Sequence, residues 1–181
     1  MKRNRVNGFT LVELLIVISI IAVLVSLLFP AIKTALVKAE AAGSQTKAQL
    51  LVNAVSAWNA TYGTWPISGV ATNVAVTSNF IQLLTGQKAA STELWIGNNP
   101  NQIKFLDFSQ NDLDSNGYYV DAWKNVYQVV VDQTYASQVT NLFAKSTYQA
   151  NICVFTAGPD HQWDQKGLTD TTNSDNIVVW K

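Results

Sequence analysis

The most distinctive stretch of the chain is residues 8–29, GFTLVELLIVISIIAVLVSLLF, an almost unbroken apolar run with one carboxylate, Glu13. Just before it stand the basic residues Lys2, Arg3 and Arg5. An ionisable side chain inside a membrane-spanning helix costs about 2.5–3.5 kcal/mol on insertion scales, and such residues usually have a function. Glu13 is therefore the first residue to explain.

The apolar segment is long enough to cross a bilayer. As a helix rising about 1.5 Å per residue, residues 9–32 would reach about 36 Å, more than a hydrocarbon core of roughly 30 Å. A short basic segment before a span tends to stay in the cytoplasm. We therefore expect a single pass, with residues 1–8 in the cytoplasm and the chain after Lys33 on the far side.

A cleaved secretory signal and a simple uncleaved anchor are the alternatives. Residues 39–41, Ala-Glu-Ala, have the small-x-small form of a signal cleavage site. However, the apolar run is longer than the core of a signal peptide, and residues 39–41 lie beyond Lys33 and Lys38. A signal core also has no use for Glu13.

Residues 8–15, GFTLVELL, resemble the processing motif of type IV prepilins and of the pseudopilins of type II secretion. The resemblance implies that a prepilin peptidase and methyltransferase removes residues 1–8 as a leader, cutting after Gly8 and N-methylating Phe9. It also implies assembly with other pilins or pseudopilins into a filament, through an inner-membrane platform and its ATPase. Pro30 falls where this family commonly has a proline.

The expected cleavage would give Glu13 a partner. It would place a cationic α-amine on Phe9, four residues before the carboxylate and within the same dry layer. Within one chain the charges would form an i, i+4 pair, whereas between staggered subunits the carboxylate of one chain would meet the amine of its neighbour. The residues allow both arrangements. The family resemblance favours the second, in which Glu13 promotes assembly.

Composition fits one small domain on a membrane anchor. Of 181 residues, 48% are hydrophobic, and the roughly 120 residues after a long helix suffice for one modest core. The precursor has 12 basic and 12 acidic side chains. Because residues 1–8 hold three of the basic ones and no acidic one, the processed chain would carry a net charge of −3. The sequence contains no basic patch of the kind that would indicate nucleic-acid binding.

The helical pattern continues beyond the membrane segment and predicts one helix over residues 9–62. Gly63 and Pro66 would end it. Pro30 and Gly43 are weak points within it, because proline removes a backbone hydrogen bond and glycine costs about 1 kcal/mol relative to alanine.

The rest of the chain, residues 63–181, is expected to form a periplasmic globular domain. A short helix is predicted at residues 79–85, and residues 133–150 fit either a long hairpin or a loop with a short helix. Segments rich in β-branched and aromatic residues predict strands at residues 103–108, 126–132, 151–157 and 176–180. The fold class is therefore α+β, a long helix packed on a small antiparallel sheet, as in the pilin fold.

Two acidic segments could bind a metal. Residues 112–117, Asp-Leu-Asp-Ser-Asn-Gly, match the opening of an EF-hand loop, but Trp123 stands where its bidentate Glu should be. The alternative for Asp112 and Asp114 is a polar turn whose side chains bond nearby backbone.

The second acidic segment, residues 156–177, concentrates the oxygen ligands that calcium prefers. It resembles the C-terminal loop of major pseudopilins of type II secretion, in which calcium orders the region. The resemblance implies Asp160 and Asp175 as ligands, with Asp170 or Ser174 in addition. The alternative is a solvated hairpin loop, since Asn176 replaces the second acid of the family ending and the glycine-rich part is missing.

A second stretch carries the same likeness. Residues 121–127, Asp-Ala-Trp-Lys-Asn-Val-Tyr, resemble an Asp-Pro-Trp-Gly-Asn-Pro-Tyr segment of those proteins, with Trp123 and Tyr127 expected to anchor the core. Cys153 is the only cysteine, so no intrachain disulfide can form, and its apolar neighbours predict burial. Many type IVa pilins have such a disulfide, so its absence points to the pseudopilin branch.

No catalytic motif occurs. His161 is the only histidine, and no serine lies in a recognisable nucleophile motif, so we expect no enzymatic activity. The sequence therefore predicts a filament subunit of a type II secretion pseudopilus or a type IV pilus, first held in the bacterial inner membrane. The alternative is a membrane-anchored periplasmic binding module that does not polymerise.

Overall fold

One long helix, α1 (Leu11–Tyr62), precedes everything else in the computed structural model. The structure describes residues 9–67, 74–87, 99–141, 146–162 and 175–181. The chain divides into two units, Met1–Ala39 and Glu40–Lys181, and α1 contributes to both. Its bounds confirm the helix that the sequence predicts.

In the first unit, α1 is an apolar helix whose hydroxyl groups bond to its own backbone. The Ser19 hydroxyl donates to the Leu15 carbonyl at 2.7 Å, and the Ser26 hydroxyl to the Val23 carbonyl at 2.8 Å. Such bonds leave no hydroxyl hydrogen to be satisfied by the surroundings, as an apolar environment requires. This part of α1 can therefore be in contact with hydrocarbon.

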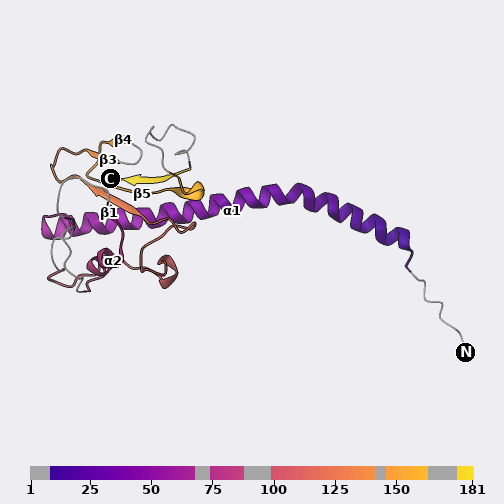
Figure 1. The fold of residues 1–181 in the computed structure, drawn as a ribbon, viewed down its shortest axis with the longest axis horizontal. Helices are drawn as coiled ribbons and strands as arrows, with labels where there is room; N and C mark the ends of the chain where they lie inside the picture. The colour runs from indigo at the N-terminus through magenta and orange to yellow at the C-terminus, as the bar shows by residue number, and fades with distance from the viewer. Residues whose placement is uncertain (1–8, 68–73, 88–98, 142–145, 163–174) are drawn as a thin grey trace, which may run out of the picture. The chain divides into compact units, whose positions relative to one another are not determined.

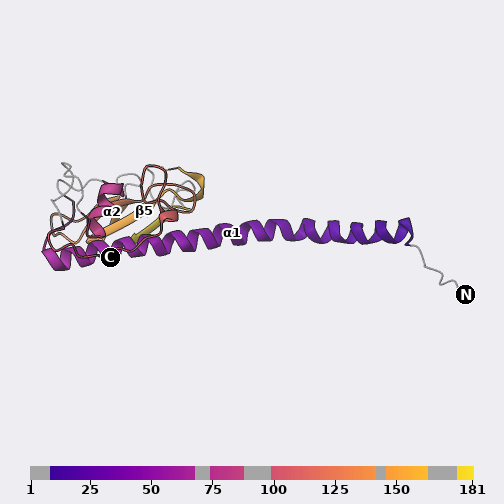
Figure 2. The ribbon, with the colours of Figure 1, turned by 90° about the horizontal axis from the view of Figure 1, so that it is seen from below.

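In the second unit, one face of α1 lies along a sheet (Figures 1 and 2). The buried positions recur every three or four residues, as an amphipathic helix requires. They are Ser44, Ala48, Leu51, Val52, Ala54, Val55 and Trp58. This face is thus the attachment surface for the globular domain.

The sheet is antiparallel and has the strand order β1-β2-β5-β6. Its members are β1 (Val74–Ala75), β2 (Gln128–Val131), β5 (Ile152–Thr156) and β6 (Ile177–Trp180). The register places Val130 opposite Cys153. A separate two-stranded sheet pairs β3 (Val139–Asn141) with β4 (Ser146–Tyr148). The hairpin alternative for residues 133–150 is therefore the one that the described residues support.

The central strands bury both faces. Val129 and Val154 belong to a core cluster that includes Leu51 of α1, whereas Val130 and Cys153 belong to a second cluster that includes Val139 of β3. This alternation follows the two-residue period of a strand. It explains why β5 is buried at every position.

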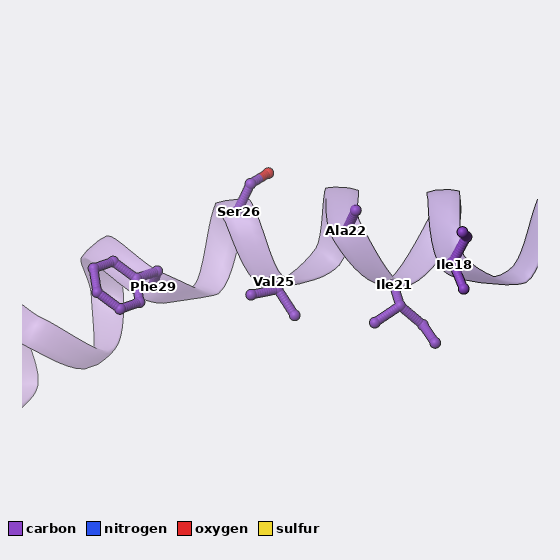
Figure 3. A pocket seen from close by; sticks show the side chains of 6 residues that line it. All are labelled: Ile18, Ile21, Ala22, Val25, Ser26 and Phe29. Atoms are coloured by element: carbon purple, nitrogen blue, oxygen red, sulfur yellow. The ribbon is translucent and has the colours of Figure 1, made fainter.

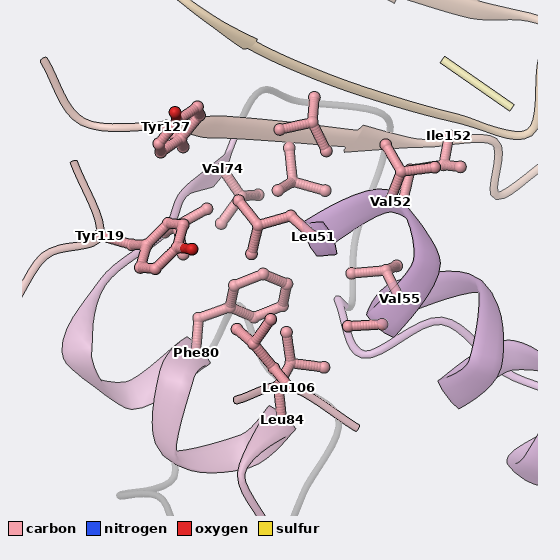
Figure 4. Packing of buried hydrophobic residues seen from close by; sticks show 14 of the residues in the cluster. Leu51, Val52, Val55, Val74, Phe80, Leu84, Leu106, Tyr119, Tyr127 and Ile152 are labelled. Carbon is pink, nitrogen blue, oxygen red and sulfur yellow. The ribbon is translucent and has the colours of Figure 1, made fainter. Parts of the chain in front are cut away.

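The main core lies between α1, the sheet and the short helix α2 (Ser78–Leu84). In Figure 4 Leu51 lies at the centre, with Phe80 of α2 on one side and Tyr127 on another. All three side chains are fully buried. The predicted short helix, the α+β class and the pilin-like layout are thus confirmed.

The strand predicted at residues 103–108 is wrong, because this segment joins no sheet. The backbone N–H groups of Phe105 and Leu106 both donate to the carbonyl of Leu84, at 2.7 and 3.1 Å. Phe105 packs on Trp58, with ring centroids 5.5 Å apart. The apolar side chains that imitate a strand therefore serve to dock an extended segment against the end of α2 and α1.

Candidate functional site

Glu13 lies in the first turn of α1 and is bonded to Thr10. The backbone N–H and the hydroxyl of Thr10 donate to Oε2 of Glu13 at 2.8 and 2.6 Å. The N–H of Glu13 in turn donates to Oγ1 of Thr10 at 3.2 Å. This reciprocal pattern is a capping box, which satisfies donors that a helix N-terminus otherwise leaves unpaired. In the unprocessed chain, Glu13 therefore holds the helix start together.

The expected processing site adjoins this cap. Phe9 is described and is 76% exposed, whereas Gly8 lies outside the described residues. Because Phe9 precedes Thr10 directly, cleavage after Gly8 would create the new amine next to the capping box. Pairing between that amine and Glu13, within a chain or between chains, stays a prediction.

The apolar part of α1 presents large hydrophobic side chains on all sides. Every one of them between Leu11 and Leu36 is exposed, most by more than half. Among the described residues, α1 is the one helix that is long and apolar enough to cross a membrane. A helix that is apolar all round needs lipid or other helices around it.

Two open grooves run along this surface. Figure 3 shows the side chains of the larger one, which are Ile18, Ile21, Ala22, Val25, Ser26 and Phe29. The second is lined by Ser19, Ile20, Val23 and Leu24. Their lining is apolar, and the two hydroxyls in it already donate to backbone carbonyls. The grooves thus suit apolar side chains or lipid tails and do not suit a polar ligand.

In the EF-hand-like turn at residues 112–117, the carboxylates of Asp112 and Asp114 bond to other groups of the protein. Oδ1 of Asp112 forms an ion pair of 2.7 Å with Lys47 of α1. Oδ1 of Asp114 accepts the N–H groups of Asn116 and Tyr118, each at 2.8 Å. Burial alone would raise the pKa of the Asp112 carboxyl, but its bond with Lys47 contributes to a pKa below the usual range. These contacts favour the polar turn over the calcium loop.

The C-terminal acidic segment brings two carboxylates close together. Asp160 ends the 3₁₀ turn η2 (Gly158–Asp160), and Asp175 stands just before β6. The backbone N–H of Asp160 lies near the Asp175 carboxylate. Oδ1 of Asp175 is buried and has no hydrogen-bond partner among the described residues. Burial, and then the charge of Asp160, raises the pKa of Asp175 above its usual range.

These features fit a cation, because an unpartnered buried carboxylate oxygen beside a second carboxylate lacks a positive partner. The other expected ligands, Asp170 and Ser174, lie outside the described residues. In the described part of the chain, no three His, Cys, Asp or Glu side chains gather as a metal site would require. The structure therefore brings together Asp160 and Asp175, and the remaining ligands stay predictions.

Asp121 is the centre of a hydrogen-bond network beside this segment. It is 2% exposed. Oδ1 accepts the N–H groups of Trp123 and Asn125 at 2.9 and 2.8 Å. Oδ2 accepts the Asn125 side-chain amide at 2.9 Å and the Thr156 hydroxyl of β5 at 2.8 Å. Because a buried carboxylate needs such partners, Asp121 fixes the turn at residues 121–125 to the sheet.

The same turn is attached to α1 through Ser44. The Ser44 hydroxyl oxygen accepts the N–H of Ala122 at 3.1 Å, and the Tyr127 hydroxyl donates to the Ser44 carbonyl at 2.8 Å. Tyr127 is fully buried, as predicted for a core anchor, and Trp123 packs on the core while partly exposed. Residues 121–127 thus join α1 to the sheet.

Cys153 and His161 are the remaining side chains with reactive groups that the sequence singled out. Cys153 is fully buried, as predicted, and burial raises the pKa of its thiol to about 12. The thiol is therefore protonated at neutral pH and unreactive. His161 is exposed and follows η2 in the left-handed conformation, with φ of 59°.

Three residues of these sites were missed from the sequence. Thr10 was detectable, since Thr10-x-x-Glu13 is the capping-box pattern before an apolar run. Ser44 carried no such signal, because its partner Ala122 lies 78 residues away in the chain. Asn125 matches the asparagine of the pseudopilin-like segment, but its partner Gly158 lies 33 residues away and could not be inferred.

Comparison with known families identifies the N-terminal segment. Residues 3–29 match the family model described as the prokaryotic N-terminal methylation motif. The match supports a pilin-like protein of the type IV pilin and pseudopilin class, with a methylated N-terminus after processing by prepilin peptidase. No curated protein and no solved structure matches the chain.

Proposed function

We propose that the protein is a structural subunit of a filament of the type IV pilus and type II secretion class. The single observation that carries the proposal is the exposed apolar helix with one carboxylate, Glu13, inside the matched methylation motif. A membrane anchor alone would not need that charge. A subunit that pairs Glu13 with a neighbour's Phe9 amine would, since each added chain repeats the contact and the fibre does not close.

The second half of α1 supports the same proposal. Residues 48–62 contain no charged side chain, although the helix has an exposed face in this range. Surfaces that stay in water usually carry charges, whereas the centres of protein interfaces are depleted of them. An uncharged outer face along α1 fits packing against other subunits.

Within the class, we favour a pseudopilus of type II secretion over a surface pilus. The segments 121–127 and 156–177 resemble those of major pseudopilins, and an intrachain disulfide is impossible with Cys153 alone. The subunit would insert once in the inner membrane with residues 1–8 in the cytoplasm, and the domain would face the periplasm. A platform protein and its ATPase would then move it into the fibre.

The decisive experiment is mass spectrometry of the N-terminus of protein from membranes of cells that contain a prepilin peptidase. We expect a chain that begins with N-methylated Phe9. Gly8→Val serves as the matched control, because it should block cleavage and leave insertion intact. A wild-type chain that starts at Met1, or at Ala42 after signal cleavage, would overturn the assignment.

Polymerisation needs its own readout, because a processed chain could still remain a membrane-anchored binding module. Overproduction together with the assembly platform should give fibres that electron microscopy detects and that antibodies to this chain decorate. A correctly methylated chain that never leaves the membrane fraction as fibres would favour the binding module.

We further propose that the C-terminal segment binds calcium through Asp160 and Asp175, completed by Asp170 or Ser174. The support is the buried unpartnered Oδ1 of Asp175 beside a second carboxylate. A bound calcium ion would supply the positive charge that the two carboxylates lack. Asp160 lies in η2 and Asp175 lies just before β6, so the two carboxylates stand at the two ends of this segment.

Calcium titration of the full chain in detergent micelles tests this second proposal. Calcium should raise the melting temperature and protect residues 156–177 from proteolysis, and magnesium should do so much less. Asp160→Asn should remove the effect. The matched control is Asp107→Asn, which changes an exposed acid that forms a surface ion pair with Lys104. Indifference of the wild type to both calcium and chelator would refute the site.

A further inference from the structure

The side chain of Asn125 binds the turn that carries Asp160 through both its amide nitrogen and its amide oxygen. Its Nδ2 donates to the Gly158 carbonyl at 2.6 Å and also to Asp121. Its Oδ1 pairs with Nδ1 of His161 at 2.6 Å. One amide group therefore binds both ends of η2, at Gly158 and at His161.

The support behind Asn125 is rigid. Its backbone N–H and its Nδ2 both bind the buried carboxylate of Asp121, which in turn accepts the hydroxyl of Thr156 in β5. Lys124, just before it, has φ of 71°, a left-handed conformation that this turn imposes. The amide of Asn125 is thus fixed by the sheet and does not depend on the position of η2.

On its other side, η2 packs against Asp175 and Asn176, which precede β6. Gly158 has φ of 71°, and a Cβ there would collide with the backbone carbonyl of Asp175. The backbone N–H of Asp160, two residues later, lies near the Asp175 carboxylate. The turn therefore lies between Asn125 and Asp175, and its position decides how near the two carboxylates are.

We propose that Asn125 is a positioning residue for the C-terminal cation site, holding η2 so that Asp160 and Asp175 are adjacent before an ion arrives. This inference rests on the calcium proposal above. Asn125 itself contributes no ligand. It acts by removing the cost of ordering the turn when the ion binds, as residues that orient metal ligands generally do.

The test compares calcium affinity with stability in the full chain in micelles. Asn125→Ala should weaken calcium binding, measured by titration calorimetry, by about 10- to 100-fold, the usual effect of losing a group that orients a ligand. In chelator, hydrogen exchange at residues 158–161 should accelerate in the variant and stay unchanged in β2. Val55→Ala, a core deletion in α1, should lower the melting temperature without changing calcium affinity.

Two further variants make the result decisive. Asn111→Ala removes the same side chain from an exposed position in the 3₁₀ turn η1 (Gln110–Asp112) and should change neither quantity. His161→Ala removes one exposed partner, so it folds even if Asn125→Ala does not, and should weaken binding to a smaller extent. Wild-type affinity in both the Asn125 and His161 variants, or in the His161 variant alone if the other does not fold, would overturn the inference and leave the calcium proposal intact. A wild-type chain that binds no calcium would instead refute that proposal, and the inference with it.

Discussion

The two halves of α1 form one continuous helix, yet the first half exposes its apolar side chains whereas the second half buries them on one face. From Leu11 to Leu36, the large apolar side chains are exposed, and within this part of α1 Glu13 is the only charged residue before Lys33. From Ser44 onward, apolar side chains on one face are completely buried. Leu24 is 54% exposed, whereas Leu51 is 0% exposed.

This difference shows which contacts stabilise each half of α1. The second half gains its stability inside the chain, by burial against the sheet and α2. The first half has no such gain among the described residues, so its apolar surface must be covered by lipid or by other chains. Substitutions in the two halves should therefore affect different properties, assembly in one and folding in the other.

The largest effect is expected at Glu13. Glu13→Val should insert in the membrane normally but give almost no fibres, because it removes the charge that would pair with the Phe9 amine of a neighbour. Electron microscopy and the sheared surface fraction measure the fibres. Glu40→Gln, an exposed acid of the same helix in the second unit, is the matched control and should assemble.

Glu13→Gln separates the charge from the cap. Glutamine can keep the capping-box bonds with Thr10, but it carries no charge. We expect it to lose fibres as Glu13→Val does. Wild-type fibre yield in Glu13→Gln would mean that Glu13 acts through the helix cap alone, and the pairing of charges would have to be abandoned.

The next effect distinguishes burial from exposure. Leu51→Ala should lower the free energy of unfolding of the domain by about 2–5 kcal/mol, because it leaves a cavity in the core. Leu24→Ala should leave that free energy unchanged and reduce fibre yield or membrane affinity. Denaturant unfolding of full chains in micelles, followed by tryptophan fluorescence, measures the first quantity. Equal losses of domain stability in both variants would contradict the division of α1.

The sequence predicted α1 from local pattern, since the apolar run and the helix over residues 9–62 follow from the composition and the periodicity. The core position of Tyr127 was expected from the likeness of residues 121–127 to a pseudopilin segment, and the structure confirms it. The strand predicted at residues 103–108 failed because its N–H groups bond to Leu84 at the end of α2, a long-range choice that composition does not record. The strand β1, two residues long, is too short for any pattern to reveal.

The candidate sites divide in the same way. Glu13 was found because a single charge in an apolar run is visible in the sequence. Asn125 was not found, because its role depends on η2, which follows it by 33 residues and is brought close by the pairing of β2 with β5. Asp160 and Asp175 were found through a family likeness, and their adjacency became visible only in the structure.

Low pH should destabilise the globular domain and leave the first half of α1 helical. Asp132 is buried after β2, and its carboxylate accepts bonds from Thr134 at 2.9 and 2.7 Å and from Ser137 at 2.6 Å. Burial would raise the pKa of Asp132, but these hydrogen bonds lower it below the usual range. Stability from this group is complete above about pH 4, where folded and unfolded chains are both ionised, and declines as the pH falls toward the lower folded pKa.

A pH titration of the full chain in micelles measures this loss. Between pH 7 and 2, near-ultraviolet circular dichroism of the domain should fade while the helical far-ultraviolet signal of the apolar segment persists. Asp132→Asn should be less stable than the wild type at pH 7, and the difference should shrink below pH 4. A constant difference across this range would rule out Asp132 as a source of the acid sensitivity.

The smallest effect is expected at Gly43, where the exposed half of α1 gives way to the buried one. A Cβ at this position would meet nothing within 4 Å, so Gly43→Ala should raise the free energy of unfolding by about 0.5–1 kcal/mol through reduced chain entropy. Gly158→Ala is the opposite control, because its φ of 71° and the nearby Asp175 carbonyl make a side chain costly there. The free energy of unfolding, measured by denaturant titration, should therefore rise for Gly43→Ala and fall for Gly158→Ala. If Gly43→Ala stabilises the domain but lowers fibre yield, Gly43 serves the close approach of neighbouring helices. Destabilisation of the domain by Gly43→Ala would contradict the open space around this position.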